Sequence, residues 1–202
     1  MASAAVLTIG ATLGTLAPLL GTVGSPIGHV ADLILSAGWT WAALAFCVGL
    51  ARKSRMESVI LAPASLITAV IAYYVTKLGQ GEFRTLDLNN PSATTTQIEW
   101  SAFLSKTVVW CIAACLLGSL LGLAGNLARN HGLRGLPFRV LVPLVAVVDT
   151  TQRLNFDAPL EGTVATTTWS VIRFIAVAVI LALVGHTVIT WRSRPSAGQA
   201  RR

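Results

Sequence analysis

The chain has 202 residues, of which 54% are hydrophobic and 11% are charged, and its mean hydropathy is +0.70. A soluble domain has about 25% charged residues, and a soluble fold of this size cannot remove so much apolar surface from water. The composition excludes a soluble globular enzyme and a disordered chain, and it predicts a polytopic membrane protein. Basic residues flank the apolar runs, so the net charge of +7 indicates membrane orientation and no nucleic-acid binding.

Five apolar stretches are long enough to span a bilayer, which takes about 20 residues of helix. They cover about 5–24, 33–51, 58–76, 107–128 and 170–191. The first has no charge and no basic segment before it, so we expect a retained span and no cleaved signal peptide. A sixth stretch, 137–152, would form roughly 24 Å of helix. That length predicts either a short tilted span or a re-entrant segment.

Basic clusters follow the second, fourth and last stretches. They are Arg52, Lys53, Arg55, Arg129, Arg134, Arg139, Arg192, Arg194, Arg201 and Arg202. The positive-inside rule places them in the cytoplasm, and the sides alternate consistently only if 137–152 also crosses. We therefore predict an all-α bundle of six spans in the cell membrane, with both termini cytoplasmic. Residues 1–191 would form one transmembrane domain, and 192–202 a basic, disordered cytoplasmic tail.

Two GxxxG motifs predict close helix packing, because glycine lets helix backbones approach each other. One is formed by Gly10 and Gly14 in the first span, and the other by Gly118 and Gly122 in the fourth. Their equivalent positions in two three-span halves are also compatible with an inverted repeat. Plain helix packing is the simpler interpretation, because glycine is common in membrane helices.

Two long outer connections, 77–106 and 150–168, separate the predicted spans. Loops of this length are usually functional or disordered. We expect short helices that pack on the outer face or a lid that covers it.

The motifs of common enzymes are absent from the sequence. It contains no phosphate-binding GxxxxGK loop, no HExxH helix, no GxSxG elbow and no CxxC pair. The three histidines lie on different segments, and Cys111 and Cys115 share a helix face inside an apolar run. Buried thiols of this kind behave as small hydrophobes. We therefore predict no metal site and no cofactor.

Charged and aromatic residues near the predicted outer boundary are the site candidates. The catalytic candidates are Asp32, Glu99, Asp149 and Arg153, and the substrate-binding candidates are Trp39, Tyr73, Tyr74, Trp100 and Arg173. Asp149 and Arg153 are spaced for an ion pair on one helix face. The aromatic residues fit an interfacial belt, or alternatively the wall of an outer pocket. A solvated or structural pair is the competing interpretation of the charged residues.

The stretch Ser36-Ala-Gly-Trp-Thr-Trp-Ala-Ala-Leu-Ala-Phe and the helix end Ala72-Tyr73-Tyr74 resemble a group of small actinobacterial membrane proteins of unknown function. In that group a Gly-Trp-x-Trp helix precedes a Tyr-Tyr helix end. A Trp-containing span with a glycine-rich end and a later proline-containing span then follow, here with Trp110, Gly118 and Pro143. The resemblance covers about two thirds of the chain. It implies a multi-span bacterial membrane protein and brings no known activity.

Three functional hypotheses remain open. The favoured one is a non-enzymatic membrane protein: a small permease, which could use Asp32 and Asp149 for ion or proton coupling, an export or immunity component, or a subunit of a larger complex. The alternative is a membrane enzyme, an acid-initiated cyclase or isomerase acting on a lipid or isoprenoid, which requires Asp32, Glu99 and Asp149 to converge on one pocket. The third is a scaffold that binds cytoplasmic partners through the basic tail. Beyond the lipid bilayer itself, the expected partners are another membrane protein or a second copy of the chain.

Overall fold

The structure, a computed structural model, describes residues 2–86, 96–130 and 132–192. In chain order its elements are α1 (Ala2–Gly21), α2 (Pro26–Leu35), α3 (Gly38–Ala51), α4 (Arg55–Gly79), β1 (Arg84–Leu86), β2 (Thr96–Ile98), α5 (Trp100–Leu127), the 3-10 turn η1 (Gly132–Arg134), α6 (Leu136–Arg139), α7 (Leu141–Phe156) and α8 (Ala158–Arg192). The predicted tail lies outside the described residues from position 193 onward. The described residues are all-α apart from one short antiparallel pair of strands.

Four helices are long and apolar enough to cross a membrane: Ser3–Gly21, Arg55–Gly79, Trp100–Leu127 and Leu160–Thr190. Helices α2 and α3 together are also apolar enough, but they meet at an angle of 58°. The predicted span 33–51 is therefore broken, as in a discontinuous span or a re-entrant loop. The predicted short span 137–152 corresponds to α6 and α7, and α7, with 16 residues, is not among the helices long enough to cross a membrane. The described residues thus form a helical protein with four helices that are long and apolar enough to span a membrane, or five spans if the bent pair is counted as one.

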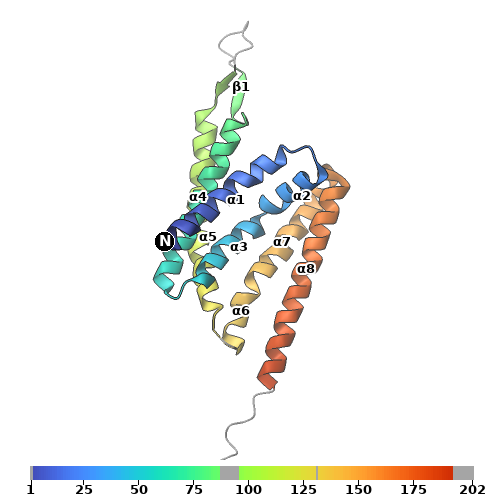
Figure 1. Cartoon of the computed structure of the whole chain (residues 1–202). Coiled ribbons are helices and arrows are strands. Elements are labelled where there is room, and N and C mark those ends of the chain that lie inside the picture. The colour runs from blue at the N-terminus through green and yellow to red at the C-terminus, as the bar shows by residue number, and fades with distance from the viewer. Residues whose placement is uncertain (1, 87–95, 131, 193–202) are drawn as a thin grey trace, which may run out of the picture.

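The connections lie at two opposite ends of the molecule (Figure 1). One end carries the α1–α2 turn, the strands and the α7–α8 junction. The other carries the α3–α4 turn, the link from α5 to α6 and the end of α8, and the N-terminus lies near its α3–α4 turn. We call the end that carries the strands the ribbon end, and the opposite end the basic end. The connections of the basic end and the helix turns next to them contain six basic residues: Arg52, Lys53, Arg55, Arg129, Arg134 and Arg139.

Helix α4 lies between α1 and α5 and packs closely on both. A methyl group on Gly10 or Gly14 of α1 would overlap backbone carbonyl oxygens of α4. On α5, a methyl group on Gly118 would lie 2.7 Å from the Cα of Pro63, which is also in α4. Both GxxxG motifs therefore face the same helix. An inverted repeat would instead place the second motif against α8, so the two motifs do not occupy equivalent positions.

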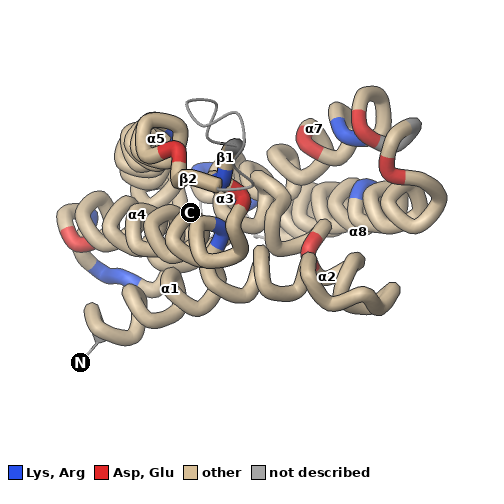
Figure 2. Tube along the Cα trace, turned by 90° about the horizontal axis from the view of Figure 1, so that it is seen from above, with Lys and Arg blue, Asp and Glu red and all other residues tan. Residues whose placement is uncertain are grey.

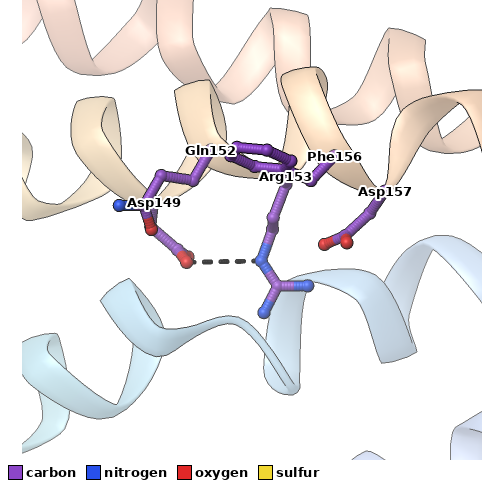
Figure 3. A pocket seen from close by; sticks show the side chains of 5 residues that line it. All are labelled: Asp149, Gln152, Arg153, Phe156 and Asp157. Carbon is purple, nitrogen blue, oxygen red and sulfur yellow. Dashed lines mark hydrogen bonds and ion pairs between the residues drawn. The ribbon is translucent and has the colours of Figure 1, made fainter.

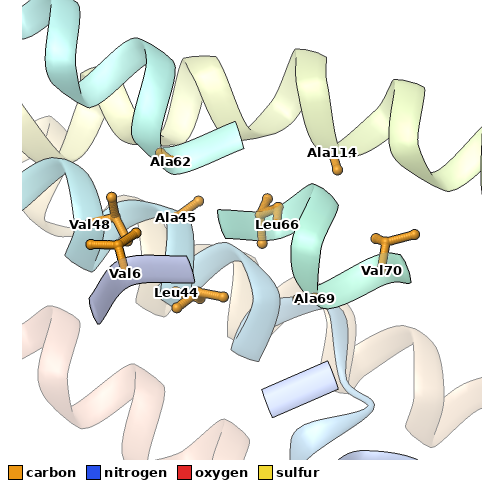
Figure 4. Close-up of a cluster of buried hydrophobic side chains, with 9 residues drawn as sticks. All are labelled: Val6, Leu44, Ala45, Val48, Ala62, Leu66, Ala69, Val70 and Ala114. Atoms are coloured by element: carbon orange, nitrogen blue, oxygen red, sulfur yellow. The ribbon is translucent and has the colours of Figure 1, made fainter. Parts of the chain in front are cut away.

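Helix α3 completes this bundle. The backbones of α3 and α5 touch where Gly49 meets Gly122 and where Gly125 meets Phe46. Small and branched apolar side chains of α1, α3, α4 and α5 fill the space between the helices (Figure 4). The members of this core are Val6, Leu44, Ala45, Val48, Ala62, Leu66, Ala69, Val70 and Ala114.

Two arginines and an asparagine of the basic end complete helix termini. The carbonyl of Arg52, the residue that ends α3, accepts hydrogen bonds from Asn126 Nδ2 at 2.7 Å and Arg129 Nη1 at 3.0 Å. Arg139 Nε donates to the carbonyl of Ala128 at 2.8 Å, where α5 ends. Cations near a helix C-terminus satisfy its free carbonyls and its dipole. Part of the basic cluster therefore stabilises the ends of helices.

Helices α7 and α8 form an antiparallel hairpin beside the bundle (Figure 1). It contacts the bundle through α3 and α7, and it contacts α2 through α8. Only 11% of the most apolar stretch of α8 is buried, against 33% in α4. Phe174, Leu181 and Ile189 of α8 are each at least two-thirds exposed, as expected for side chains that face lipid.

In the described part of the two long connections, extensions of the flanking helices and one pair of strands take the place of the expected short helices. The described part of 77–106 extends α4 to Gly79 and then forms the β1–β2 pair, in which Arg84 is opposite Ile98. The expectation failed here because hairpin strands of three residues leave almost no periodicity in the sequence. The segment 150–168 is helical apart from the α7–α8 junction at Asp157 and a kink at Gly162, whose φ of 82° suits glycine. Because this segment is polar, the search for apolar stretches did not predict that α7 and α8 extend into it.

Candidate functional site: a broken apolar helix beside an ion pair

The break between α2 and α3 is held by side chains that follow it. A helix leaves its last carbonyls without partners, and burial makes this costly. Here Thr40 Oγ1 donates to the carbonyl of Ile34, and Trp41 Nε1 donates to that of Leu35 at 3.0 Å. Ser36 Oγ closes the end of α2 by donating to the carbonyl of Asp32 at 2.7 Å. The Gly-Trp-Thr-Trp stretch thus stabilises a corner in the backbone, which goes beyond the expected interfacial belt.

An ion pair of α7 lies against this corner. Arg153 Nε is 3.3 Å from Asp149 Oδ1, as the i,i+4 spacing allows, and the two side chains are 23% and 20% exposed. The guanidinium group points from α7 toward the segment that joins α2 and α3 (Figure 3). A methyl group on Gly38, the first residue of α3, would lie 3.7 Å from Asp149 Oδ1. The carboxylate therefore lies at the positive end of α3, where the capping residue Ala37 offers no side-chain acceptor.

Trp169 of α8 supports the ion pair from the other side. The centre of the guanidinium group lies 5.8 Å from the centroid of the indole ring, which is a cation–π distance. Trp169 is fully buried and packs with Leu33 of α2 and with Ala165. The guanidinium group is therefore held between α8 and the broken helix. Trp169 was not among the site candidates predicted from the sequence, and only the fold brings it next to Arg153.

Asp32 of α2 lies where α2 meets α1. Its half-buried carboxylate is close to the end of α1, since a methyl group on Gly21 would lie 3.1 Å from Asp32 Oδ2. On α4, Lys77 pairs with Glu82 at 2.6 Å. Figure 2 shows acidic positions on α2 and α7 on one side of the molecule.

Three buried polar atoms at this place have no hydrogen-bond partner among the described residues. They are Trp39 Nε1, Asp149 Oδ2 and Trp169 Nε1. Buried polar atoms are nearly always hydrogen-bonded, and an unpaired one calls for a specific explanation. Asp149 and Trp169 both contact Arg153, and Trp39 follows the glycine that flanks Asp149. Buried polar atoms without a described hydrogen-bond partner therefore cluster near the break between α2 and α3.

The other aromatic and acidic candidates form a separate group at the base of the strands. A row of ring contacts with centroid distances of 5.4–6.2 Å runs from α3 over α4 to α5. Its members are Trp41, Tyr73, Tyr74, Phe83, Phe103 and Trp100. These rings pack against one another and anchor the strands to the bundle. Glu99 is exposed beside them and bonds through its backbone to Phe83.

The predicted site residues therefore divide between two places. Asp32, Trp39, Asp149 and Arg153 lie around the broken helix, whereas Glu99, Tyr74 and Trp100 lie at the strand base. Trp41 joins the two places, because it bonds to Leu35 at the corner and contacts the ring of Tyr73. Arg173 is exposed on α8. Among the described residues, no group of three or more His, Cys, Asp or Glu side chains could hold a metal ion.

No protein-family model matches the chain, and neither the curated proteins nor the solved structures contain a significant match to it.

Proposed function

We propose that the protein is a small permease of the cell membrane, whose solute pathway passes the break between α2 and α3. The observation that carries this proposal is the position of an apolar, broken helix against the Asp149–Arg153 pair. Transporters use discontinuous helices in this way, because the broken ends supply backbone groups and helix dipoles to polar cargo. Non-helical backbone at membrane depth is tolerated where it is enclosed by protein or lines a watery cavity.

The proposed topology has six passes, with α7 as the short fifth span and both termini in the cytoplasm. It is supported by the segregation of the connections to two ends and by the basic residues in the α3–α4 and α5–α6 connections. The ribbon end would then face outward, and so would the ion pair. Membership of the actinobacterial group, and association with a second copy or another membrane protein, stay predictions.

Asp32 and Asp149 are the carboxylates that we assign to ion or proton coupling. Asp149 forms a 3.3 Å pair with Arg153 of α7, and Asp32 lies on α2 beside Gly21. Neutralising Asp149 would free the guanidinium group of Arg153 for other partners. Ionisable groups within a membrane protein are suited to couple ion binding to a change of conformation.

The arrangement of the candidate residues supports the enzyme alternative less than the permease. It required Asp32, Glu99 and Asp149 to line one pocket together with the aromatic candidates. Glu99 and Trp100 instead lie at the strand base, where the rings are occupied with one another. We therefore do not propose acid-initiated chemistry.

Uptake into proteoliposomes tests the permease. Four radiolabelled solutes of one size, an amine, a carboxylate, an amino acid and a neutral amide, would be offered with and without an imposed pH gradient. We expect uptake of at least one class above that of empty vesicles, and loss of that uptake in the double variant Asp32→Asn, Asp149→Asn. Glu161→Gln, an exposed acidic residue at the same end, is the matched control and should keep full uptake. Unchanged uptake in the double variant, or none for any class, contradicts the proposal.

A further inference from the structure

The basic end carries an excess of positive charge. Its connections and the adjoining helix turns contain six basic residues and one acidic residue, Glu57. Lys53, Arg55 and Arg134 are exposed, and none of the three forms an ion pair with another described residue. Cations gathered at one end of a molecule repel one another and attract an anionic partner. The charge therefore predicts a negatively charged ligand at this end.

Two arginines of the basic end are held in place by backbone carbonyls. Arg129 Nη1 donates to the carbonyl of Arg52 at 3.0 Å, which joins the end of α5 to the α3–α4 turn. Arg139 donates through Nε to Ala128 and through Nη2 to Asn130, the residues that flank Arg129 in the chain. A guanidinium group has further N–H donors beyond these bonds, and their planar arrangement matches a phosphate group. Because both side chains are already ordered, a phosphate that accepts from them costs little additional side-chain entropy.

Exposed apolar side chains lead up to these cations on two helices. On α4, Met56 and Ile60 lie one helical turn apart next to Arg55, and each is more than half exposed. On α5, Leu116 and Leu120 are likewise more than half exposed, on the face that leads toward the end of the helix at Leu127. In a bilayer such side chains contact acyl chains. A phospholipid presents the same order, with a phosphate group directly next to apolar chains.

We propose that the basic end binds the headgroup of an anionic phospholipid, whose phosphate accepts hydrogen bonds from Arg129 and lies among the cations of the α3–α4 and α5–α6 connections. Basic surfaces next to membrane helices attract anionic lipids in this way. An acidic protein or a free phosphate ion would match the charge but would leave the neighbouring apolar side chains uncovered. The positive-inside rule requires only cations on one side, whereas ordered arginines beside an exposed apolar face specify a lipid. This binding does not depend on the proposed permease, and no covalent step is involved.

Native mass spectrometry of the full chain, released from detergent micelles, tests the preference. The probes are dioleoyl phosphatidylglycerol and dioleoyl phosphatidylcholine, which share their acyl chains and a phosphate but differ in net charge. We expect phosphatidylglycerol to bind at least about tenfold more tightly, because the cations repel the choline group and several of them act on one headgroup. The preference should fall as the ammonium acetate concentration is raised.

Three results of this titration would overturn the assignment. Equal affinity for the two lipids would leave an acidic protein as the partner that complements the charge. A preference that soluble glycerol phosphate removes would show a site for free anions. A preference that does not respond to salt would show that the charge of the basic end is not its cause.

Two matched double variants locate the lipid. Lys53→Gln, Arg134→Gln removes one exposed cation from each connection of the basic end, and because neither side chain forms a described ion pair, the variant should fold normally. We expect it to reduce the preference at least about fivefold. The control, Arg84→Gln, Lys106→Gln, also removes one arginine and one lysine, both exposed, but near the ribbon end, and it should keep the preference. An equal reduction in both variants would show an effect of net charge alone, and no reduction in either would exclude the basic end.

Arg129→Gln tests the ordered arginine. This variant loses the hydrogen bond to the carbonyl of Arg52 and can lower stability, so the readout is the ratio of the affinities for the two lipids. A purely structural role would weaken the binding of both lipids alike, whereas contact with the phosphate and its charge predicts a lower ratio. Arg129→Lys keeps the charge and should restore part of it. An unchanged ratio in Arg129→Gln would remove Arg129 from the headgroup site.

Discussion

The four-helix bundle of α1, α3, α4 and α5 and the α7–α8 hairpin are held by different forces. In the bundle, glycines bring helix backbones into direct contact, and small apolar side chains fill the remaining space. The hairpin makes its contacts with α2 and α3 near a single ion pair and a buried tryptophan. Close contacts between helix backbones therefore hold the first region, whereas the junction with the second combines an ion pair with the apolar packing of Trp169 on Leu33.

This difference follows from the membrane environment. Lipid tails are as apolar as leucine, so apolar burial alone does not drive helices together, and close packing or polar contacts must do so. The bundle is held by close packing and is expected to be rigid. The hairpin makes polar contacts with the bundle at the break between α2 and α3. A movement of α7 and α8 relative to the bundle would disturb few close contacts.

The strongest test of the bundle is Gly49→Ala. A methyl group there would overlap the carbonyl oxygen of Gly122. The methyl group would be fixed to the backbone of α3 and the carbonyl belongs to the backbone of α5, so neither can rotate away. Overpacking of this kind typically costs 1–3 kcal/mol, and we expect about 3 kcal/mol or more because no side chain can yield. The free energy of unfolding would be measured by SDS titration in mixed micelles.

Gly185→Ala of α8 is the matched control. No atom lies within 4 Å of the methyl group that it would add. Alanine also favours helix by up to about 1 kcal/mol relative to glycine, so this variant should be neutral or slightly stabilised. Equal destabilisation of both variants would show that α8 is packed as closely as the bundle, and the comparison between the two regions would fail.

The junction is tested by Arg153→Leu. Removing the cation leaves the carboxylate of Asp149 partly buried without its partner. Such a loss costs 3–5 kcal/mol when the pair is fully buried, and about 1–3 kcal/mol is expected here because a fifth of each side chain remains exposed. Unfolding in mixed micelles measures the change.

Arg173→Leu removes an exposed arginine of α8 and is the control, with a change below about 0.5 kcal/mol. The double variant Asp149→Asn, Arg153→Leu should recover part of the lost stability, because it no longer leaves an unpaired charge. A double variant that is less stable than the sum of its single changes would contradict the assigned ion pair.

The length of apolar runs predicted the four long helices, because a membrane span requires about 20 continuous apolar residues. It could not predict the break after Leu35, since the residues on both sides are equally apolar. The signal was present in Thr40 and Trp41, whose donors satisfy the orphaned carbonyls, but such donors are recognised only once the corner is seen. The spacing of Asp149 and Arg153 indicated the pair, whereas Trp169 joins it only through the packing of α7 on α8.

The smallest expected effect concerns the corner between α2 and α3, where the bundle meets the hairpin. Trp41→Phe keeps an aromatic ring beside Tyr73 but removes the indole donor from the carbonyl of Leu35. A lost hydrogen bond of this kind costs about 1 kcal/mol, because the carbonyl stays half-buried without a partner. Trp110→Phe, on the exposed face of α5, loses no described hydrogen bond and should change stability by less than about 0.5 kcal/mol. If thermal unfolding shows the same stability for both variants, the corner is held by the flanking helices and the Trp41 hydrogen bond is incidental. If only Trp41→Phe is weakened, the side chains of α3 themselves keep the helix broken beside Asp149.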